Sequence, residues 1–279
     1  MERELSGKTD SEIRFFRPDR RLLPYVRYHW VMRSSMRSNV LTFPTGCPQI
    51  IFHKRSPLLV TELGSRQSAF TVSGQVNFPA HLCADGDTEM IVTVFHPHTV
   101  GPFIDASPSS FYNQEISGYD LRNRRLDELA SRVFDCDDNV KCINMIENWL
   151  LARLEQCSGA DSLSGFPRVC AAVRRLLDEP SVRVSELASI ACLGRKQFER
   201  VFCVSVGMNP KEYSRIVRFQ KSLWMMQNEA DGYADIACAC GYADQSHFIR
   251  EFKAFSGLTP KELAAAGCSP YSDLYANPF

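Results

Sequence analysis

Residues 194–202 read GRKQFERVF and residues 244–252 read DQSHFIREF, so one pattern occurs twice in this chain at an offset of fifty residues. Phe, Arg and Phe stand at the same three places in both stretches, and a Gly-x-x-Pro-Lys-Glu sequence follows each. A repeat at a fixed period is the signature of one supersecondary unit present in several copies. We therefore expect two related helical units near the C-terminus.

Each copy has the parts of a helix-turn-helix. In the first, Ser185 is the predicted N-cap of a short helix that stops near Cys192. The matching helix in the second covers residues 233–240, and Gly241 supplies the left-handed turn residue. After each turn the two phenylalanines, spaced four apart, face one side and leave a polar side opposite. From Pro210 a long helix is predicted to about Met226, which joins the two units.

The second helix of such a unit lies in the major groove of DNA, with its N-terminal side chains at the base edges. Arginine and lysine suit guanine there, and glutamine suits adenine. Glu199 either accepts from a cytosine amine or pairs with Lys196 on the surface, and His247 fits packing or a phosphate contact better than a base contact. The predicted DNA-contacting residues are Arg195, Lys196, Gln197, Glu199, Arg200, Lys221, Gln245, Ser246, His247, Ile249, Arg250 and Lys253.

Residues 166–264 resemble the DNA-binding domain of the AraC/XylS family of bacterial transcription regulators. The family's second-motif signature, G-[FY]-x-[DS]-x-S-x-F-x-R-x-F-K-x-x-x-G-x-[ST]-P, is matched from Gly241 to Pro260 at every fixed position. The first motif departs twice, with Gly194 where a capping serine is usual and Cys192 where glycine is usual. The resemblance implies a transcription regulator that binds double-stranded promoter DNA and works with RNA polymerase.

The N-terminal part reads as several short strands separated by glycine and proline, which predicts a small β-sandwich or barrel. The family resemblance implies a cupin-like domain here that binds a small-molecule effector, so the expected fold class is α+β. Aromatic and histidine side chains either line a ligand cavity or form the barrel core and rim. The predicted strands are 22–32, 40–43, 49–53, 57–61, 69–74 and 89–95, and the candidate ligand-binding residues are Trp30, Phe43, His53, Phe70, His81, Phe95 and His96.

The predicted organisation has five parts. A β-rich effector domain at 1–118 precedes an amphipathic helical pair at 119–157, which either forms a dimerisation surface, giving a homodimer, or covers one face of the barrel. A linker rich in serine and glycine at 158–165 leads to the DNA-binding domain at 166–266. The tail at 267–279 is expected to be loosely held.

Charge is balanced overall but not locally. The formal net charge is +0, whereas seven Lys or Arg and two Glu lie between Arg195 and Lys221. A local basic stripe of this kind suits phosphate contacts. No N-terminal apolar run is long enough for a signal peptide or a membrane helix, so a cytoplasmic location with no membrane partner is expected.

The 11 cysteines are scattered and odd in number, which does not indicate a disulfide framework. Cys47, Cys83, His53 and His81 leave open a redox- or metal-sensing regulator, although no metal site and no cofactor are expected. A zinc-bound, methyl-accepting DNA-repair protein is disfavoured because only Cys47 and Cys83 precede residue 120. The sequence shows no paired nucleophile and base of the kind that an enzyme needs, so an enzyme is not expected.

Overall fold

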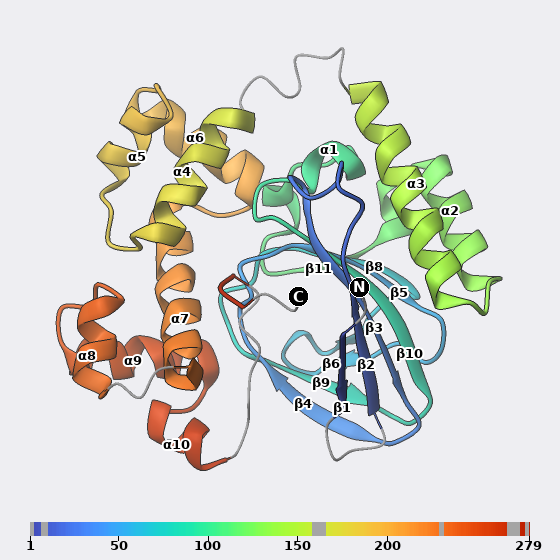
Figure 1. Cartoon of the computed structure of the whole chain (residues 1–279), viewed down its shortest axis with the longest axis horizontal. Coiled ribbons are helices and arrows are strands. Elements are labelled where there is room, and N and C mark those ends of the chain that lie inside the picture. Colours follow the sequence, from blue (N-terminus) through green and yellow to red (C-terminus); the bar gives the residue numbers. More distant parts are fainter. Residues whose placement is uncertain (1–2, 7–10, 158–165, 229–231, 267–273, 277–278) are drawn as a thin grey trace.

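The computed structural model describes residues 3–6, 11–157, 166–228, 232–266, 274–276 and 279. Figure 1 shows a β-rich part built from the residues before 158 beside a helical part that begins at residue 166. The predicted α+β class is confirmed. The predicted linker at 158–165 and residues 267–273 of the predicted tail lie outside the described residues. Among the described residues, no helix has the length and apolar character needed to cross a bilayer.

Two antiparallel sheets form the β-rich part. The larger has seven strands in the order β1-β2-β3-β10-β5-β8-β11, and the smaller has four in the order β4-β9-β6-β7. Their strands are β1 (Arg3–Ser6), β2 (Ser11–Phe16), β3 (Val26–Ser34), β4 (Ser38–Thr42), β5 (Gln49–His53), β6 (Leu59–Val60), β7 (Ser65–Arg66), β8 (Phe70–Ser73), β9 (Ala80–Ala84), β10 (Thr88–Phe95) and β11 (Glu115–Ser117).

All six predicted strand runs overlap a strand of the structure. The pattern missed β1, β2, β7, β9 and β11; of these, β7 and β11 have two and three residues, and β1 and β9 lack the β-branched and aromatic residues that mark strands. Strand β9, for example, reads AHLCA and pairs with both β4 and β6. Pairing with neighbours, rather than local preference, makes these segments strands.

Strand β10 lies in the middle of the larger sheet and is buried along its whole length. Met90, Val92 and Val94 belong to the core cluster that extends into the helical part. Ile91 and Phe95 belong to a second cluster, shared with the helices that cover the other face of the sheet. Coverage on both faces explains why this strand is a nearly continuous apolar run rather than an alternating one.

Helices α2 (Arg124–Phe134) and α3 (Asn139–Cys157) cover the outer face of the larger sheet (Figure 1). Their apolar stripes pack against it, and polar contacts fix α3 to the strands. His29 on β3 lies 2.9 Å from the Thr93 hydroxyl and 3.4 Å from the Glu147 carboxylate on α3. Of the two roles considered for this helical pair, covering the sheet is what the structure shows, and a dimer contact stays a prediction.

The helical part contains the predicted segments in order. Over its described residues, the helices are α4 (Phe166–Asp178), α5 (Val184–Ile190), α6 (Arg195–Val206), α7 (Pro210–Asn228), α8 (Tyr233–Ala239), α9 (Gln245–Ser256) and α10 (Pro260–Ala265). The prediction of Ser185 as an N-cap is wrong, because Arg183 occupies that position and Ser185 lies inside α5.

The expectation of a loosely held tail is wrong for the residues described there. Leu274 is buried, and the Tyr275 hydroxyl donates to the Leu177 carbonyl of α4 over 2.8 Å. From the β-rich part, Arg27 donates to the carbonyls of Leu274 and Ala276. This short segment therefore contacts both parts of the chain, which no local sequence signal indicated.

Candidate DNA-binding interface

Helix α6 is the second helix of the first unit, and its N-terminal turn is open to solvent. Phe198 and Phe202 are fully buried, whereas Arg195, Lys196, Gln197 and Arg200 are exposed. These four residues, all predicted to contact DNA, therefore lie on the exposed side of α6, as the spacing of the phenylalanines predicted.

The turn before α6 departs from ideal geometry where the sequence departed from the family pattern. Cys192 has φ +53°, the left-handed conformation that favours glycine. Gly194 is the N-cap and has no side chain to accept a hydrogen bond from the first turn. The first recognition helix thus starts from a strained turn and lacks a side-chain cap.

Glu199 is engaged within the helix. Its carboxylate accepts from Arg195 Nε over 3.0 Å, one turn away, so Arg195 and not Lys196 is its surface partner. The Arg195 side chain is 70% exposed, and an exposed pair of this kind contributes little to stability. Breaking this contact therefore costs little.

The second unit is better capped than the first. Gly241 takes the left-handed turn with φ +76°, and the Asp244 side chain accepts from the backbone N–H of His247 over 2.7 Å. Gln245, Ser246 and Arg250 are exposed at the start of α9.

Two further predicted contacts of α9 have structural roles. The His247 ring accepts from the Ala243 backbone N–H over 3.3 Å and packs edge-on against Tyr242. Ile249 is half-buried against the core. Lys253, in the last turn of α9, is exposed, and Lys221 on α7 is half-buried.

Glu251 is a buried acid that the sequence reading did not single out. It lies on the inner side of α9 and accepts from Arg215 Nε over 2.6 Å and from Arg218 over 3.1 Å, both on α7. The Arg218 guanidinium also lies 5.3 Å from the centroid of the Tyr242 ring. Two of the seven basic residues of the predicted stripe are therefore neutralised internally, where they fasten α7 to α9.

Comparison with known families separates the two parts of the chain. A model described as a helix-turn-helix domain matches residues 187–266. The C-terminal part of this chain is an AraC-type helix-turn-helix domain. A second model, described as a domain of unknown function, DUF6597, matches residues 14–117.

The curated relatives are HTH-type transcription regulators. The HTH-type transcriptional regulator ArgR of Pseudomonas aeruginosa is 28% identical over 102 residues, which are 36% of this chain and 31% of the regulator. The RCS-specific HTH-type transcriptional activator RclR of Escherichia coli is 33% identical over 103 residues, 36% of each chain. The chain thus spans about a third of the length of these relatives. A solved AraC-type regulator structure from Chromobacterium violaceum is 22% identical, covers 39% of this chain and 100% of its own, and has a TM-score of 0.36.

The β-rich part docks on the AraC-type domain through the linking helix α7. Gln220 donates to the Pro44 carbonyl over 2.6 Å, and the Tyr213 hydroxyl donates to the Gly46 carbonyl over 3.3 Å. The rings of Phe43 and Phe219 meet edge-on at 5.9 Å. Because these groups are mostly buried, the helix that spaces the two recognition helices is packed against the N-terminal part.

A second contact involves the C-terminal end of α6. The Ser107 hydroxyl donates to the Val204 carbonyl over 3.0 Å, and the short helix η2 (Pro108–Phe111) follows directly. A Cβ on Gly207 would lie 3.1 Å from the Pro108 carbonyl oxygen, so the two backbones approach closely. The β-rich part therefore contacts the C-terminal end of α6, while the N-terminal turn of α6 stays exposed.

The repeated glutamates of the two Pro-Lys-Glu sequences have different roles. Glu262 closes a capping box with Thr259 at the start of α10. Glu212, its counterpart, also accepts from Asn77 Nδ2 over 2.6 Å and from the Tyr112 hydroxyl, both in the β-rich part. Burial, with the hydrogen bond to Glu212 next, raises the pKa of Tyr112, so the phenol stays protonated and donates.

The seven candidate ligand-binding residues lie in different places in the β-rich part, and their role in binding a ligand stays a prediction. Trp30 and Phe43 pack on the core cluster that extends into the AraC-type domain. Phe70 and Phe95 face the opposite side of the sheet, where Phe70 stacks on Phe52. A strand turns alternate side chains to opposite faces, so aromatic content alone cannot place them together.

The three candidate histidines are also separated. His81 is exposed and lies 2.7 Å from the Glu62 carboxylate. The His96 ring donates from Nε2 to the Leu23 carbonyl over 3.1 Å, and burial lowers its pKa to about 4. His53 is buried near Gln67, and burial lowers its pKa to about 4 as well.

The residues considered for metal or redox sensing lie on several elements: Cys47 precedes β5, His53 ends β5, and His81 and Cys83 lie on β9. Cys47 is buried, and burial raises the pKa of its thiol to about 11, which disfavours the reactive thiolate. Cys83, on β9, contacts the Thr61 hydroxyl at 3.5 Å. Within the described ranges, no three His, Cys, Asp or Glu side chains are grouped closely enough to hold a metal ion.

Proposed function

We propose that this chain is a sequence-specific transcription regulator that places α6 and α9 in consecutive major grooves on one face of promoter DNA. The observation that carries the proposal is the pairing of two helices whose phenylalanines are buried and whose first turns are exposed and polar. Recognition helices of helix-turn-helix proteins present their N-terminal residues in this way.

The base-contacting residues proposed are the exposed ones. Arg200 and Arg250 occupy the same place in the two copies and have the fork geometry that reads guanine. Lys196, Gln197, Gln245 and Ser246 flank them. Lys221 and Lys253 are proposed phosphate contacts. The AraC-type match and the regulators that share it support these roles.

We further propose that a small molecule bound by the N-terminal part controls DNA binding. Its support is the buried interface, because Gln220 and Tyr213 tie the β-rich part to the helix that spaces the two reading helices. A change in the β-rich part therefore acts on the geometry of the DNA-binding surface. RNA polymerase as a partner and a homodimer are proposed from the family resemblance alone.

Footprinting of the full chain on sites selected from random DNA tests the DNA-binding proposal. One molecule is expected to protect about two helical turns, since consecutive major grooves on one face lie about 34 Å apart. Arg200→Ala and Arg250→Ala are expected to weaken protection at opposite ends of the site. Arg132→Ala, an exposed position on α2, serves as the control that leaves protection unchanged. Protection of one short half-site, or no preference for selected over random sequence, contradicts the proposal.

A further inference from the structure

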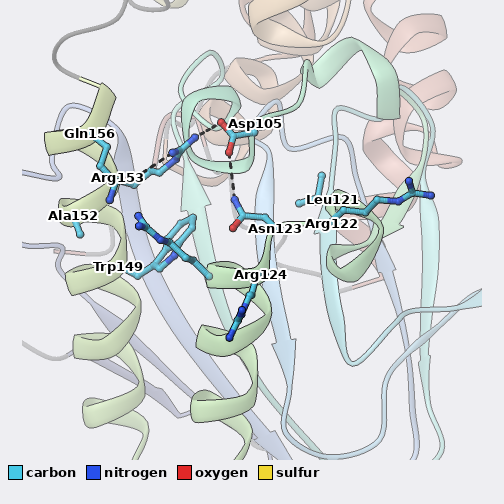
Figure 2. A pocket seen from close by; sticks show the side chains of 10 residues that line it. Asp105, Leu121, Arg122, Asn123, Arg124, Trp149, Ala152, Arg153 and Gln156 are labelled. Atoms are coloured by element: carbon cyan, nitrogen blue, oxygen red, sulfur yellow. Dashed lines mark hydrogen bonds and ion pairs between the residues drawn. The ribbon is translucent and has the colours of Figure 1, made fainter.

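An open pocket of about 480 Å³ lies in the N-terminal part, beside α3 and the start of α2. Figure 2 shows that α3 and the start of α2 supply most of its walls, while Asp105, which follows α1 (Gly101–Ile104), lies at its edge. The lining contains four arginines against a single acid. These residues are Asp105, Leu121, Arg122, Asn123, Arg124, Arg125, Trp149, Ala152, Arg153 and Gln156.

The positions of these arginines lower the stability of the fold. Arg124 and Arg125 are the first two residues of α2, where the positive end of the helix dipole destabilises cations. Arg124 pairs with Glu128, but Arg122 and Arg125 have no ion-pair partner among the described residues. Arg122 also holds a left-handed backbone with φ +53°. Local costs without a structural gain are typical of functional sites.

Asp105 occupies the place of an anion in this pocket. Its carboxylate accepts from the Arg153 guanidinium and, over 3.3 Å, from Asn123 Nδ2, as Figure 2 shows. The Arg153 side chain is only 21% exposed, and its Nε is buried without an acceptor in the described part of the chain. Trp149 lies beside it and is half-buried, so its ring offers an apolar surface next to the guanidinium.

We propose that this pocket binds a small-molecule anion, a carboxylate or phosphate carried on a flat apolar group. Arg153 and Arg125 neutralise the anion, because guanidinium groups bind carboxylate and phosphate through paired hydrogen bonds. Trp149 packs against the apolar group, and the N-terminus of α2 adds its favourable dipole. Binding replaces Asp105 as the partner of Arg153.

This replacement connects the pocket to the AraC-type domain, a step that rests on the proposed function. Asp105 begins the segment 105–113, and three of its residues touch the DNA-binding domain: Ser107 at Val204, Pro108 at Gly207 and Tyr112 at Glu212. Asp105 and Asn113, at its two ends, both have left-handed backbones, with φ +54° and φ +57°. A ligand that frees Asp105 therefore acts on one end of the segment that holds α6 and α7.

Calorimetric titration of the full chain with phenyl phosphate, with benzoate and with neutral benzyl alcohol tests the site. Both anions are expected to bind and the alcohol is not. Arg125→Gln and Arg153→Gln should each weaken anion binding by about tenfold or more, since each removes a hydrogen bond to a charged group. Asp105→Asn should tighten it, because the internal competitor is weakened. Arg132→Gln, in the last turn of the same helix α2, is the charge-matched control and should bind as the wild type does.

Failure of both anions to bind at millimolar concentration, equal binding of benzyl alcohol, or wild-type affinity in Arg125→Gln overturns the site. Arg125 is exposed, so this variant folds whether or not Arg153→Gln does. Operator affinity measured by fluorescence anisotropy, with and without phenyl phosphate, tests the connection separately. Binding of phenyl phosphate with no change in operator affinity overturns the connection and leaves the site standing. Absence of any operator binding refutes the proposed function, while the calorimetric result on the pocket stands independently.

Discussion

Replacing Glu212 by glutamine tests how strongly the β-rich part is held on the AraC-type domain. Glu212 Oε1 accepts from Asn77 and from Tyr112 across the interface. A hydrogen bond to a charged group contributes about 1.5–3 kcal/mol and a neutral one about 0.5–1.5 kcal/mol. Removing the charge from two such bonds at a half-buried carboxylate, which water still partly screens, is expected to lower the free energy of unfolding by about 1–2 kcal/mol.

The second copy of the repeat supplies the matched control. Glu262 stands at the same place in its unit, and among the described residues it accepts within its own capping box, from Thr259 over 2.7 Å. Glutamine takes the same capping role as glutamate. Glu262→Gln is therefore expected to change stability little, although the chemical change is identical.

Chemical denaturation followed by circular dichroism measures both variants against the wild type. The double variant Tyr112→Phe/Glu212→Gln completes a double-mutant cycle and is expected to show a coupling energy of about 1 kcal/mol, the scale typical of residues in contact. Equal effects of Glu212→Gln and Glu262→Gln, or strict additivity in the cycle, would refute the reasoning that Glu212 connects the two parts.

Cys192→Gly is expected to raise the free energy of unfolding by up to about 1 kcal/mol by relieving the left-handed turn, whereas Cys192→Ala, which keeps a Cβ, should give no gain in thermal denaturation. Arg200→Ala and Arg250→Ala should each weaken the free energy of binding to the selected site by about 1–3 kcal/mol, and competition binding should show a reduced sequence preference of the protein. Lys221→Ala should weaken binding to selected and random DNA alike, and equal losses for all three variants would show that the arginines do not read bases. Burial lowers the pKa of His53 to about 4, so the unfolded chain binds a proton that the native chain does not between pH 6.5 and 4. Stability should therefore fall as pH drops through that window, and His53→Gln should make the fall smaller; an unchanged slope would contradict the assignment.

The sequence predicted the local structure wherever one residue type decides the backbone conformation. The paired phenylalanines, the capping sequences before Pro210 and Pro260 and the turn at Gly241 predicted the helices of the AraC-type domain within a few residues. The departures at Cys192 and Gly194 likewise predicted where the first unit is strained or uncapped. These features depend on neighbours within about four positions, which a sequence displays directly.

Other features depend on which faces meet. The aromatic residues of the N-terminal part were recognised as apolar, but Phe43 lies at the contact with α7 while Phe70 faces the helical layer, and only the sheet topology separates them. Glu251 reads as one more surface charge until α9 lies against α7 and two arginines surround it. A charged residue looks the same in the sequence whether its side chain is solvated or paired.

The two-copy repeat by itself predicted the helices of the AraC-type domain, because helix spacing and capping are local properties and occur in both copies. Its tertiary structure decided the rest. Glu212 and Glu262 occupy equivalent places in the sequence, yet only Glu212 meets Asn77 and Tyr112, residues roughly a hundred positions or more away in the chain. Such long-range contacts follow from how the β-rich part packs on α7, and no pattern of neighbouring residues specifies that packing.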